Sequence, residues 1–317
     1  MIGRVAVFGA ASWNTMIKVP EFPPSAAGTV FPSGWHETIG SSGAGKAMNL
    51  ARLGVEVTLH CLIGRDEAGA RIRRGLEVAG VQVDALADPT GSARHVNLMD
   101  ARGDRLSFLL HTGDAAARYD ADRVEDLVRA ADLVLVAIVD PARHVIPIAR
   151  RLGKPVWTDL HATDGEREYE RDFHEADVVF FSGERMADPR PFMERLVREG
   201  RRFVVCTRGV RGAIALTADG AWLDVPAESV AEVADTNGAG DAFLAGVAYG
   251  ELRGLPLERS LRIGASVAAL SVTSTELASP DLSAASVADL LPAEEAGGDS
   301  EADDEPADEN RDADPQR

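Results

Sequence analysis

Cysteines, basic residues and aromatic residues are all scarce in this chain of 317 residues. The two cysteines, Cys61 and Cys206, lie far apart in apolar strand-like runs. This excludes a disulfide framework or a cysteine metal site, and it predicts two inert buried thiols. Lysine and arginine number 33 against 51 aspartates and glutamates. Because nucleic-acid binding requires a basic face, this balance argues against a nucleic-acid partner.

Long apolar runs are also missing. No run approaches the roughly 20 apolar residues that a membrane helix needs, so we expect no membrane partner. The first nine residues, Met1–Gly9, predict a strand that enters a glycine turn, and they lack the features of a signal peptide. A cytoplasmic protein is the simplest account of these absences.

Acidic residues are concentrated at the C-terminal end. Residues 293–317 contain eleven aspartates and glutamates against two arginines, which is half of the net charge of −18. This segment has no large apolar residue, so it cannot bury enough surface to offset the entropy of ordering it. We expect a disordered acidic tail after a folded domain of residues 1–292, and we expect deletion of the tail to leave that domain active. A tail that binds a partner is the alternative.

Short β-branched segments alternate with helical patterns along the folded domain. Strands are predicted at Val5–Phe8, Val55–Leu62, Leu133–Val139, Pro155–Asp159, Val178–Phe181 and Phe203–Thr207. Helices are predicted at residues 44–53, 66–79, 121–130, 141–152 and 190–199. This alternation favours an α/β fold with a mostly parallel central sheet and helices on both faces.

Two regions have a different pattern, about residues 14–40 and 92–112. In the second of them, Arg94–Met99 and Leu106–Leu110 flank a turn at Gly103-Asp104 and predict an antiparallel hairpin. The two regions together predict a small β-sheet lid over the C-terminal edge of the main sheet, where ligands of open α/β sheets bind. A further hairpin is expected at Ile214–Leu216 and Trp222–Val225.

The run Asp235-Thr236-Asn237-Gly238-Ala239-Gly240-Asp241 carries the strongest functional signal, and an apolar helical pattern follows it. A glycine-rich turn that opens a helix presents unpaired N–H groups at the positive end of the helix dipole. The N–H groups of Gly238, Ala239 and Gly240 therefore suit the charge on a transferring phosphoryl group. Asp241, in the first turn, can accept a proton from an attacking hydroxyl. A glycine-rich turn without chemistry is the alternative.

Three segments together resemble the PfkB family of carbohydrate kinases, the ribokinase-like group. The run above is similar to the family's Asp-Thr-x-Gly-Ala-Gly-Asp signature. Gly40–Gly54 resembles its glycine-rich segment and the Ala-Arg-Leu-Gly helix end, and Thr207–Gly212 resembles its Thr-x-Gly-x-x-Gly nucleotide loop. The segments occur in family order, and the likeness covers roughly residues 2–290.

The resemblance implies a ribokinase-like three-layer α/β/α fold and an enzyme that uses ATP and Mg²⁺ to phosphorylate a hydroxyl of a sugar or sugar-like molecule. It assigns Asp241 as the general base, and it places Thr207, Gly209 and Gly212 in the nucleotide loop. Asp235 falls at a monovalent-cation site, so K⁺ is a further candidate cofactor. The family likeness also allows a homodimer that pairs through the lid.

The resemblance places five residues on the acceptor side: Asn14, Gly40, Ser41, Gly45 and Arg94. Asn14 stands where family kinases often carry aspartate, and Gly45 stands where many sugar kinases carry asparagine. Ser42 replaces a frequent lysine. Arg94 lies on a predicted lid strand, from which arginines of some family members hold a sugar phosphate. A nucleoside or a sugar phosphate therefore stays open as the acceptor.

A further departure follows a central strand. The family usually has Asn-x-x-Glu there, whereas this chain has Ser182-Gly183-Glu184-Arg185. Ser182 can still bind a phosphate or a metal-bound water, and Glu184 can supply the carboxylate, but Arg185 reverses the expected charge. This departure leaves open a second class of function, a nucleotide-binding or ligand-binding regulatory protein with little transfer activity.

The segment Gly40–Lys46 also fits a Walker A loop through its lysine. The next Walker position requires serine or threonine to hold Mg²⁺, and here it is Ala47. We therefore favour the ribokinase-like interpretation, in which Lys46 is simply an early helix residue. Asp159 and His161, at the end of a predicted strand, are expected near the cleft.

Overall fold

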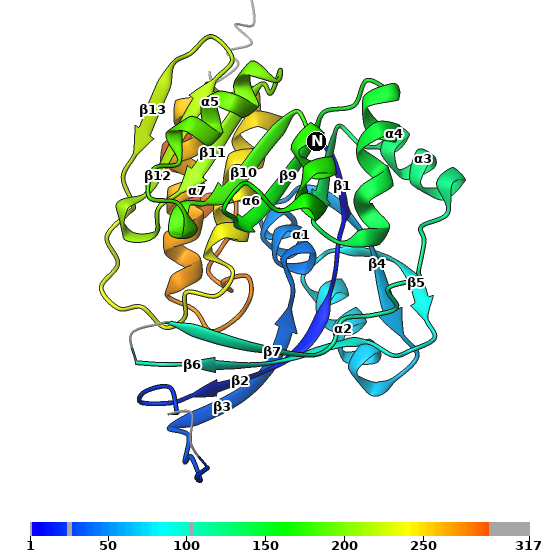
Figure 1. The fold of residues 1–317 in the computed structure, drawn as a ribbon, viewed down its shortest axis with the longest axis vertical. Helices are drawn as coiled ribbons and strands as arrows, with labels where there is room; N and C mark the ends of the chain where they lie inside the picture. Colours follow the sequence, from blue (N-terminus) through cyan, green and yellow to red (C-terminus); the bar gives the residue numbers. More distant parts are fainter. Residues whose placement is uncertain (1, 24–26, 102–103, 292–317) are drawn as a thin grey trace, which may run out of the picture.

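A computed structural model describes residues 2–23, 27–101 and 104–291 (Figure 1). The predicted tail, residues 293–317, and Gly103 of the predicted lid turn lie outside the described residues. In the described part of the chain, no helix is both long and apolar enough to cross a bilayer.

The central sheet has nine strands within the described residues: β1 (Arg4–Phe8), β4 (Glu56–Gly64), β5 (Gln82–Asp88), β8 (Leu133–Ala137), β9 (Val156–Ala162), β10 (Val178–Ser182), β11 (Phe203–Thr207), β12 (Ala213–Thr217) and β13 (Trp222–Val225). Their order is β13-β12-β11-β10-β9-β8-β1-β4-β5. All neighbours are parallel except the pairs that involve β12 and β13. The predicted mostly parallel sheet is thus confirmed, as is the hairpin of β12 and β13.

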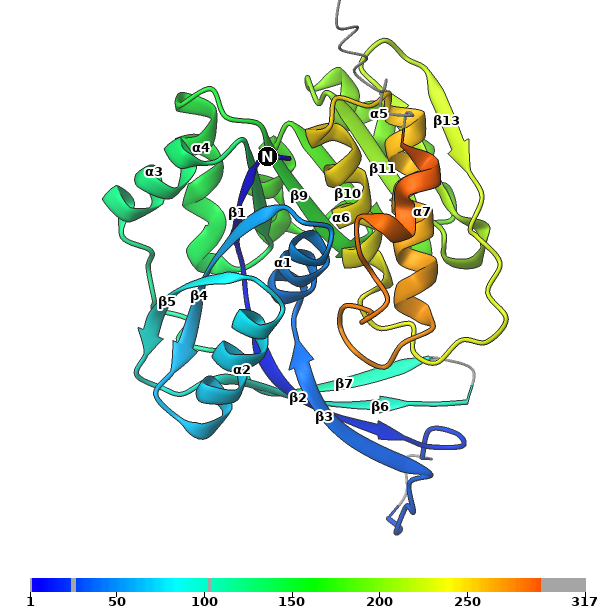
Figure 2. The same cartoon turned by 180° about the vertical axis from the view of Figure 1, so that it is seen from behind.

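Helices cover both faces of this sheet (Figures 1 and 2). One face carries α1 (Ser42–Arg52), α2 (Glu67–Val78), α6 (Ala239–Leu252) and α7 (Leu257–Val272). The other carries α3 (Ala121–Ala130), α4 (Val145–Arg151) and α5 (Arg190–Arg198). Five short 3-10 segments complete the described chain: Asp140–His144, Glu168–Glu175, Gly183–Arg185, Gly209–Arg211 and Ala285–Leu290. Because the central strands are covered on both sides, β8 is buried along its whole Leu-Val-Leu-Val-Ala sequence.

Strand β5 is absent from the prediction. It lies at the edge of the central sheet, and its sequence Gln-Val-Asp-Ala-Leu-Ala-Asp is partly exposed. An edge strand that packs on few neighbours does not need a continuous apolar run, so its pattern is weak.

The predicted lid is a second sheet of four strands within the described residues: β2 (Ser12–Lys18), β3 (Gly34–Gly40), β6 (Ala93–Met99) and β7 (Arg105–His111). Its order is β3-β2-β6-β7, with β2 and β6 parallel and the two outer pairs antiparallel. Strand β1 leads almost directly into β2, so the lid grows from the C-terminal edge of the central sheet (Figure 1).

Helix α6 is apolar on all sides, and its residues 241–250 are all buried. It packs closely on α7, because a Cβ atom at Gly246 would lie 2.8 Å from the Cα atom of Gly264. This tight packing holds the N-terminus of α6 in place at the edge that the lid covers (Figure 2).

Candidate active site

The site is built around the N-terminus of α6. Gly238 caps this helix in the left-handed conformation, with φ of 84°, and the amide of Ala242 donates to its carbonyl at 2.9 Å. The N–H groups of a first helical turn have no acceptor within the helix, although that of Ala239 makes a long hydrogen bond of 3.4 Å to the carbonyl of Thr236. A Cβ atom at Gly240 would meet nothing within 4 Å, so an anion can approach this turn closely.

Asp241 follows in the same first turn and is 9% exposed. Its Oδ1 atom accepts hydrogen bonds from Ser42 Oγ at 2.7 Å and from Lys46 Nζ at 2.5 Å. Lys46 also donates to Ser42 Oγ. The other carboxylate oxygen, Asp241 Oδ2, lies beside Gly45. A Cβ atom at Gly45 would lie 2.7 Å from this oxygen. One oxygen of Asp241 is therefore fixed by α1, and the other stands where α1 has no side chain.

Lys46 corrects an expectation from the sequence. It is not simply an early helix residue, because it is 2% exposed and its Nζ atom also pairs with Asp159 Oδ2 at 3.0 Å. The Walker A alternative is also wrong, because α1 follows the lid strand β3 and its lysine faces two carboxylates. Sequence reasoning missed this role because the partners are 113 and 195 residues away in the chain.

Burial disfavours the charged forms of Lys46 and Asp159, but their mutual attraction outweighs that cost. The pKa of Lys46 is raised, although burial opposes the shift, because Asp159 and Asp241 attract its charge. Burial likewise opposes the lowering of the pKa of Asp159 to about 2, which Lys46 and His161 produce. The site therefore holds these groups as a lysine ammonium and a carboxylate near neutral pH.

Two non-glycine residues in the described chain have positive φ, and both lie at this edge: Ser41 at 74° and His161 at 56°. His161 is the second-last residue of β9, its N–H donates to Asp159 Oδ1 at 2.9 Å, and its ring lies 3.6 Å from the same carboxylate. Such backbone strain gathers at functional sites.

Three predicted acceptor-side residues, Asn14, Gly40 and Ser41, come together where β2, β3 and α1 meet. Ser41 donates to Ser12 Oγ at 2.8 Å, and Ser12 donates to Asn14 Oδ1 at 2.7 Å. These two hydrogen bonds orient the amide of Asn14 and leave its Nδ2 atom as a donor. A Cβ atom at Gly40 would lie 1.9 Å from that Nδ2 atom, so Asn14 can occupy this position only opposite a glycine.

Gly45 belongs to the Asp241 side of the cleft, as described above. Arg94 does not join the cluster. It is exposed and pairs in register with Trp13, whereas His95 pairs with Asn14. Because adjacent positions of a strand point to opposite faces, Arg94 and Asn14 lie on opposite faces of the lid. His95 is the residue on the Asn14 face, and nothing in its local sequence marked it.

The predicted nucleotide side lies at the ends of β10 and β11. Ser182 and Thr207 are register partners, so they stand side by side at this edge. Gly209 and Gly212 both have positive φ, 58° and 78°, as their loop requires. Here too the predicted residues come together.

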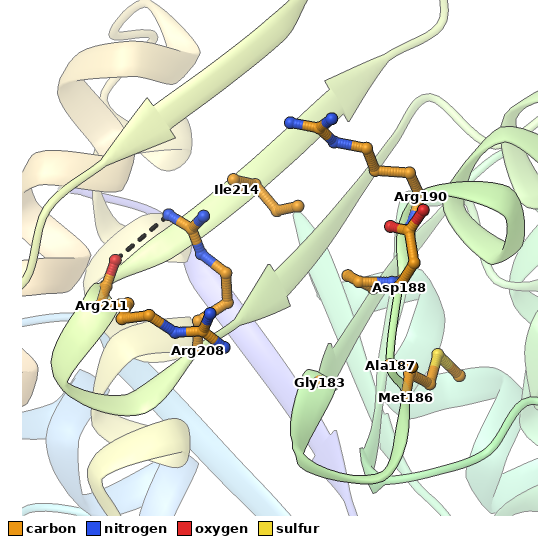
Figure 3. Close-up of a pocket in the computed structure, with 9 residues that line it drawn as sticks. Gly183, Met186, Ala187, Asp188, Arg190, Arg208, Arg211 and Ile214 are labelled. Atoms are coloured by element: carbon orange, nitrogen blue, oxygen red, sulfur yellow. Dashed lines mark hydrogen bonds between the residues drawn. The ribbon is translucent and has the colours of Figure 1, made fainter.

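A small pocket adjoins this loop and is lined by Gly183, Met186, Ala187, Asp188, Pro189, Arg190, Arg208, Arg211 and Ile214. In Figure 3, Arg208 and Arg211 lie on one side of Ile214, and Arg190 with Asp188 lies on the other. Arg208 is held by Asp224 at 2.7 Å. The pocket also contains the carboxylate of Asp188, so the exposed guanidinium groups of Arg190 and Arg211 are the ones that can attract an anionic ligand.

Two further contacts concern the predicted cation site and the lid. Asp235 is 8% exposed, and its Oδ1 atom accepts the N–H of Asn237 at 2.8 Å. Among the residues that the structure describes, no group of three His, Cys, Asp or Glu side chains is arranged to hold a metal ion. Arg105 of β7 donates to Asn237 Oδ1, which ties the lid to the loop before Gly238. No sequence signal marked that contact.

The sequence profile of the pfkB family of carbohydrate kinases matches residues 3–152 and 170–284. The chain belongs to this family. The kinase is 35% identical over 277 residues to acarbose 7(IV)-phosphotransferase from Actinoplanes sp., a match that covers 85% of this chain and 92% of that protein.

Solved structures agree on the fold of this kinase. A microbiome-derived acarbose kinase superposes with a TM-score of 0.81 at 25% identity, over 90% of this chain and 98% of that one. The Arabidopsis thaliana ribokinase, solved with ribose and ATP, gives a TM-score of 0.77 at 20% identity, over 92% and 99% of the two chains. The ribokinase-like fold and the carbohydrate-kinase class predicted from the sequence are therefore confirmed.

Proposed function

We propose that this kinase transfers the γ-phosphoryl group of ATP to a hydroxyl of a sugar-like small molecule, with Asp241 as the general base. The observation that carries the proposal is the position of Asp241. Asp241 lies in the first turn of α6, next to the N–H groups at the N-terminus of that helix. One turn thus supplies both a proton acceptor and an anion site.

In this reaction the acceptor hydroxyl gives its proton to Asp241 Oδ2 while its oxygen bonds to the γ-phosphorus. The bond from that phosphorus to the β–γ bridging oxygen breaks, and ADP leaves with the electron pair. The N–H groups of Gly238, Ala239 and Gly240 stabilise the charge on the transferring group. Donors of this kind contribute about 3 kcal/mol each in known oxyanion sites.

The donor side of the proposal rests on Ser182, Thr207 and the glycine turn at Gly209 and Gly212. Arg211 lies in the same loop and is exposed, so its guanidinium group suits the negative charge of a nucleotide. In proteins, Mg²⁺ usually keeps several water ligands and is bound by substrate phosphates and one or two carboxylates. Glu184 is exposed near Ser182, so it can supply such a carboxylate. When bound, the ion neutralises phosphate charge.

Two narrower proposals concern the cation and the compartment. The buried carboxylate of Asp235, which precedes the Gly238–Asp241 turn, suits a monovalent cation such as K⁺. Replacing K⁺ by Na⁺ in the kinase assay tests this. A cytoplasmic location accords with the use of ATP and with two free buried cysteines.

A sugar-like acceptor is favoured by the neutral character of the cluster at Asn14, Ser12 and Ser41. Amide and hydroxyl groups exchange hydrogen bonds with sugar hydroxyls without adding charge. Both the Actinoplanes relative and the microbiome-derived structure act on acarbose by name, so we propose an acceptor of that kind. A phosphate-bearing acceptor is less well supported, because Arg94 lies on the other face of the lid.

We also propose that two copies pair through the lid. Strand β7 is the edge of the lid sheet and exposes four large apolar side chains: Leu106, Phe108, Leu109 and Leu110. An apolar edge strand can pair with the same strand of a second copy about a two-fold axis. Sedimentation should show a dimer, and Leu109→Lys should give a monomer. A wild-type monomer would refute the pairing.

The decisive experiment measures ATP consumption by the purified protein with Mg²⁺ and K⁺. The panel contains sugars, acarbose, sugar phosphates and nucleosides, and the Asp241→Asn variant runs alongside. Turnover with one acceptor, reduced roughly 10²- to 10⁴-fold in a folded variant, would establish the enzyme and its general base. Nucleotide binding without turnover on any acceptor would favour the regulatory alternative that the Ser182-to-Arg185 segment leaves open.

A further inference from the structure

The proposed reaction assigns no role to Lys46, a charged residue that is buried beside Asp241. Lys46 lies on α1 with 2% of its surface exposed, and its Nζ atom contacts two carboxylates and a hydroxyl. Placing an ammonium group in a protein interior is costly unless it is paired and hydrogen-bonded. If the position served packing alone, an apolar side chain would cost less to bury. The buried charge of Lys46 therefore indicates a functional role.

The geometry gives that reason at Asp241. Lys46 and Ser42 lie one helical turn apart on α1, and both contact Oδ1 of Asp241. The first oxygen of the carboxylate is thereby occupied by two donors. The second, Oδ2, is left beside Gly45, where the helix has no side chain.

Asp159 anchors the lysine from the opposite side. It lies in the buried part of β9, and its Oδ2 atom lies 3.0 Å from Lys46 Nζ. The titratable groups that face the ammonium therefore come from two elements, Asp241 from α6 and Asp159 from β9, with His161 behind Asp159. Without this ammonium group, Asp159 would lose the attraction that lowers its pKa against the cost of burial.

We infer that Lys46 is a positioning residue for phosphoryl transfer: it holds Asp241 by Oδ1, so that Oδ2 faces the acceptor, and it ties this carboxylate to Asp159 of β9. The inference rests on the proposed role of Asp241 as general base. It assigns no contact between Lys46 and either substrate. A lysine that bound the nucleotide directly would act on nucleotide affinity instead.

The test compares Lys46→Met, Lys46→Arg and the double variant Lys46→Met/Asp159→Asn. Lys154→Met is the matched control, because Lys154 donates only to the carbonyl of Ala131 on the far side of the sheet within the described contacts. In Lys46→Met we expect kcat to fall about 10²-fold, the cost of a misplaced catalytic group, with small changes in KM for both substrates. Lys46→Arg should restore part of kcat.

The pH profile separates positioning from simple support of the fold. In Lys46→Met the acid limb of kcat should move to higher pH, because Asp159 then loses the attraction that lowers its pKa and accepts a proton beside Asp241. In the double variant the limb should return to that of the wild type while kcat stays low. The double variant also removes the uncompensated charge, so it keeps the test valid if Lys46→Met does not fold.

Three outcomes would overturn the inference. The first is an unchanged kcat in folded Lys46→Met. The second is a raised KM for ATP with normal kcat, which means direct nucleotide binding. The third is a lower kcat with an unmoved acid limb and no rescue by arginine, which means structural support alone.

A readout without turnover distinguishes this inference from the proposed function. The carboxyl ¹³C signal of Asp159, assigned with Asp159→Asn, should titrate near the folded pKa of about 2 in the wild type. In Lys46→Met its pKa should rise to or above the ordinary value of about 4. An unchanged titration refutes the coupling. A shifted titration in a protein that phosphorylates nothing in the panel refutes the kinase proposal alone.

Discussion

The acceptor side and the nucleotide side of the cleft are built by opposite means. On the acceptor side, charged groups are buried and paired, with Lys46, Asp159 and Asp241 all at most 9% exposed. On the nucleotide side, Arg190 and Arg211 are exposed, and the loop is shaped by positive-φ glycines. The charged groups of the acceptor side are therefore paired before any ligand binds, whereas the exposed arginines of the nucleotide side can pair with a bound anion.

The difference follows from what each side must do. Proton transfer requires a carboxylate held in a fixed orientation and protonation state, which a buried ion-pair network provides. Nucleotide binding requires close approach of backbone and neutralisation of phosphate charge, which glycines and exposed guanidinium groups provide. Substitutions on the acceptor side should therefore change kcat, and those on the nucleotide side should change KM.

Among the tests of this comparison between the two sides, Gly45→Ala should have the largest effect. The added Cβ atom would lie 2.7 Å from Asp241 Oδ2 and 3.0 Å from its Cβ atom, so the carboxylate must move. We expect kcat to fall about 10²-fold with little change in KM for ATP. Steady-state kinetics measure both constants. Gly28→Ala is the control, because its Cβ atom would meet nothing within 4 Å, and a normal kcat in Gly45→Ala would contradict the orientation proposed for Asp241.

Gly212→Ala should have a smaller effect, and it should change KM for ATP and not kcat. Its Cβ atom would approach the Val225 carbonyl to 2.0 Å, which forces the nucleotide loop away from β13. KM for ATP should rise about tenfold, equivalent to about 1.4 kcal/mol, while kcat is largely kept. Gly220→Ala is the matched control, since Gly220 shares the positive φ without a clash. An equal KM for ATP in both variants would contradict the role of this loop in nucleotide binding.

The smallest effect concerns stability in acid. The folded pKa of Asp159 is about 2, against an ordinary value of about 4, so the unfolded chain binds the proton first. The free energy of unfolding should therefore lose about 2 kcal/mol from this group as pH falls from about 4 to about 2. Urea unfolding at several pH values measures the loss, and Asp159→Asn should lack this part of it. Identical pH dependence in the two proteins would argue against the buried pair.

The elements that carry the site could largely be predicted because they leave local signals. The glycine run before α6, the buried parallel strands and the lid hairpin each follow from residue patterns within a few neighbours. Strand β5 escaped because an edge strand needs no apolar run. Arg94 was expected at the acceptor and His95 was not, since register with β2 decides which of them shares the face of Asn14.

The sequence by itself determined the family, the α/β architecture and the glycine turn around Asp241, because helix and strand periodicity and glycine placement are local properties. Only the tertiary structure decided that Lys46 stands between Asp159 and Asp241. The interaction of charges depends on their distance and burial. Both are set by how α1 packs against α6 and β9, and separation along the chain contains no record of them.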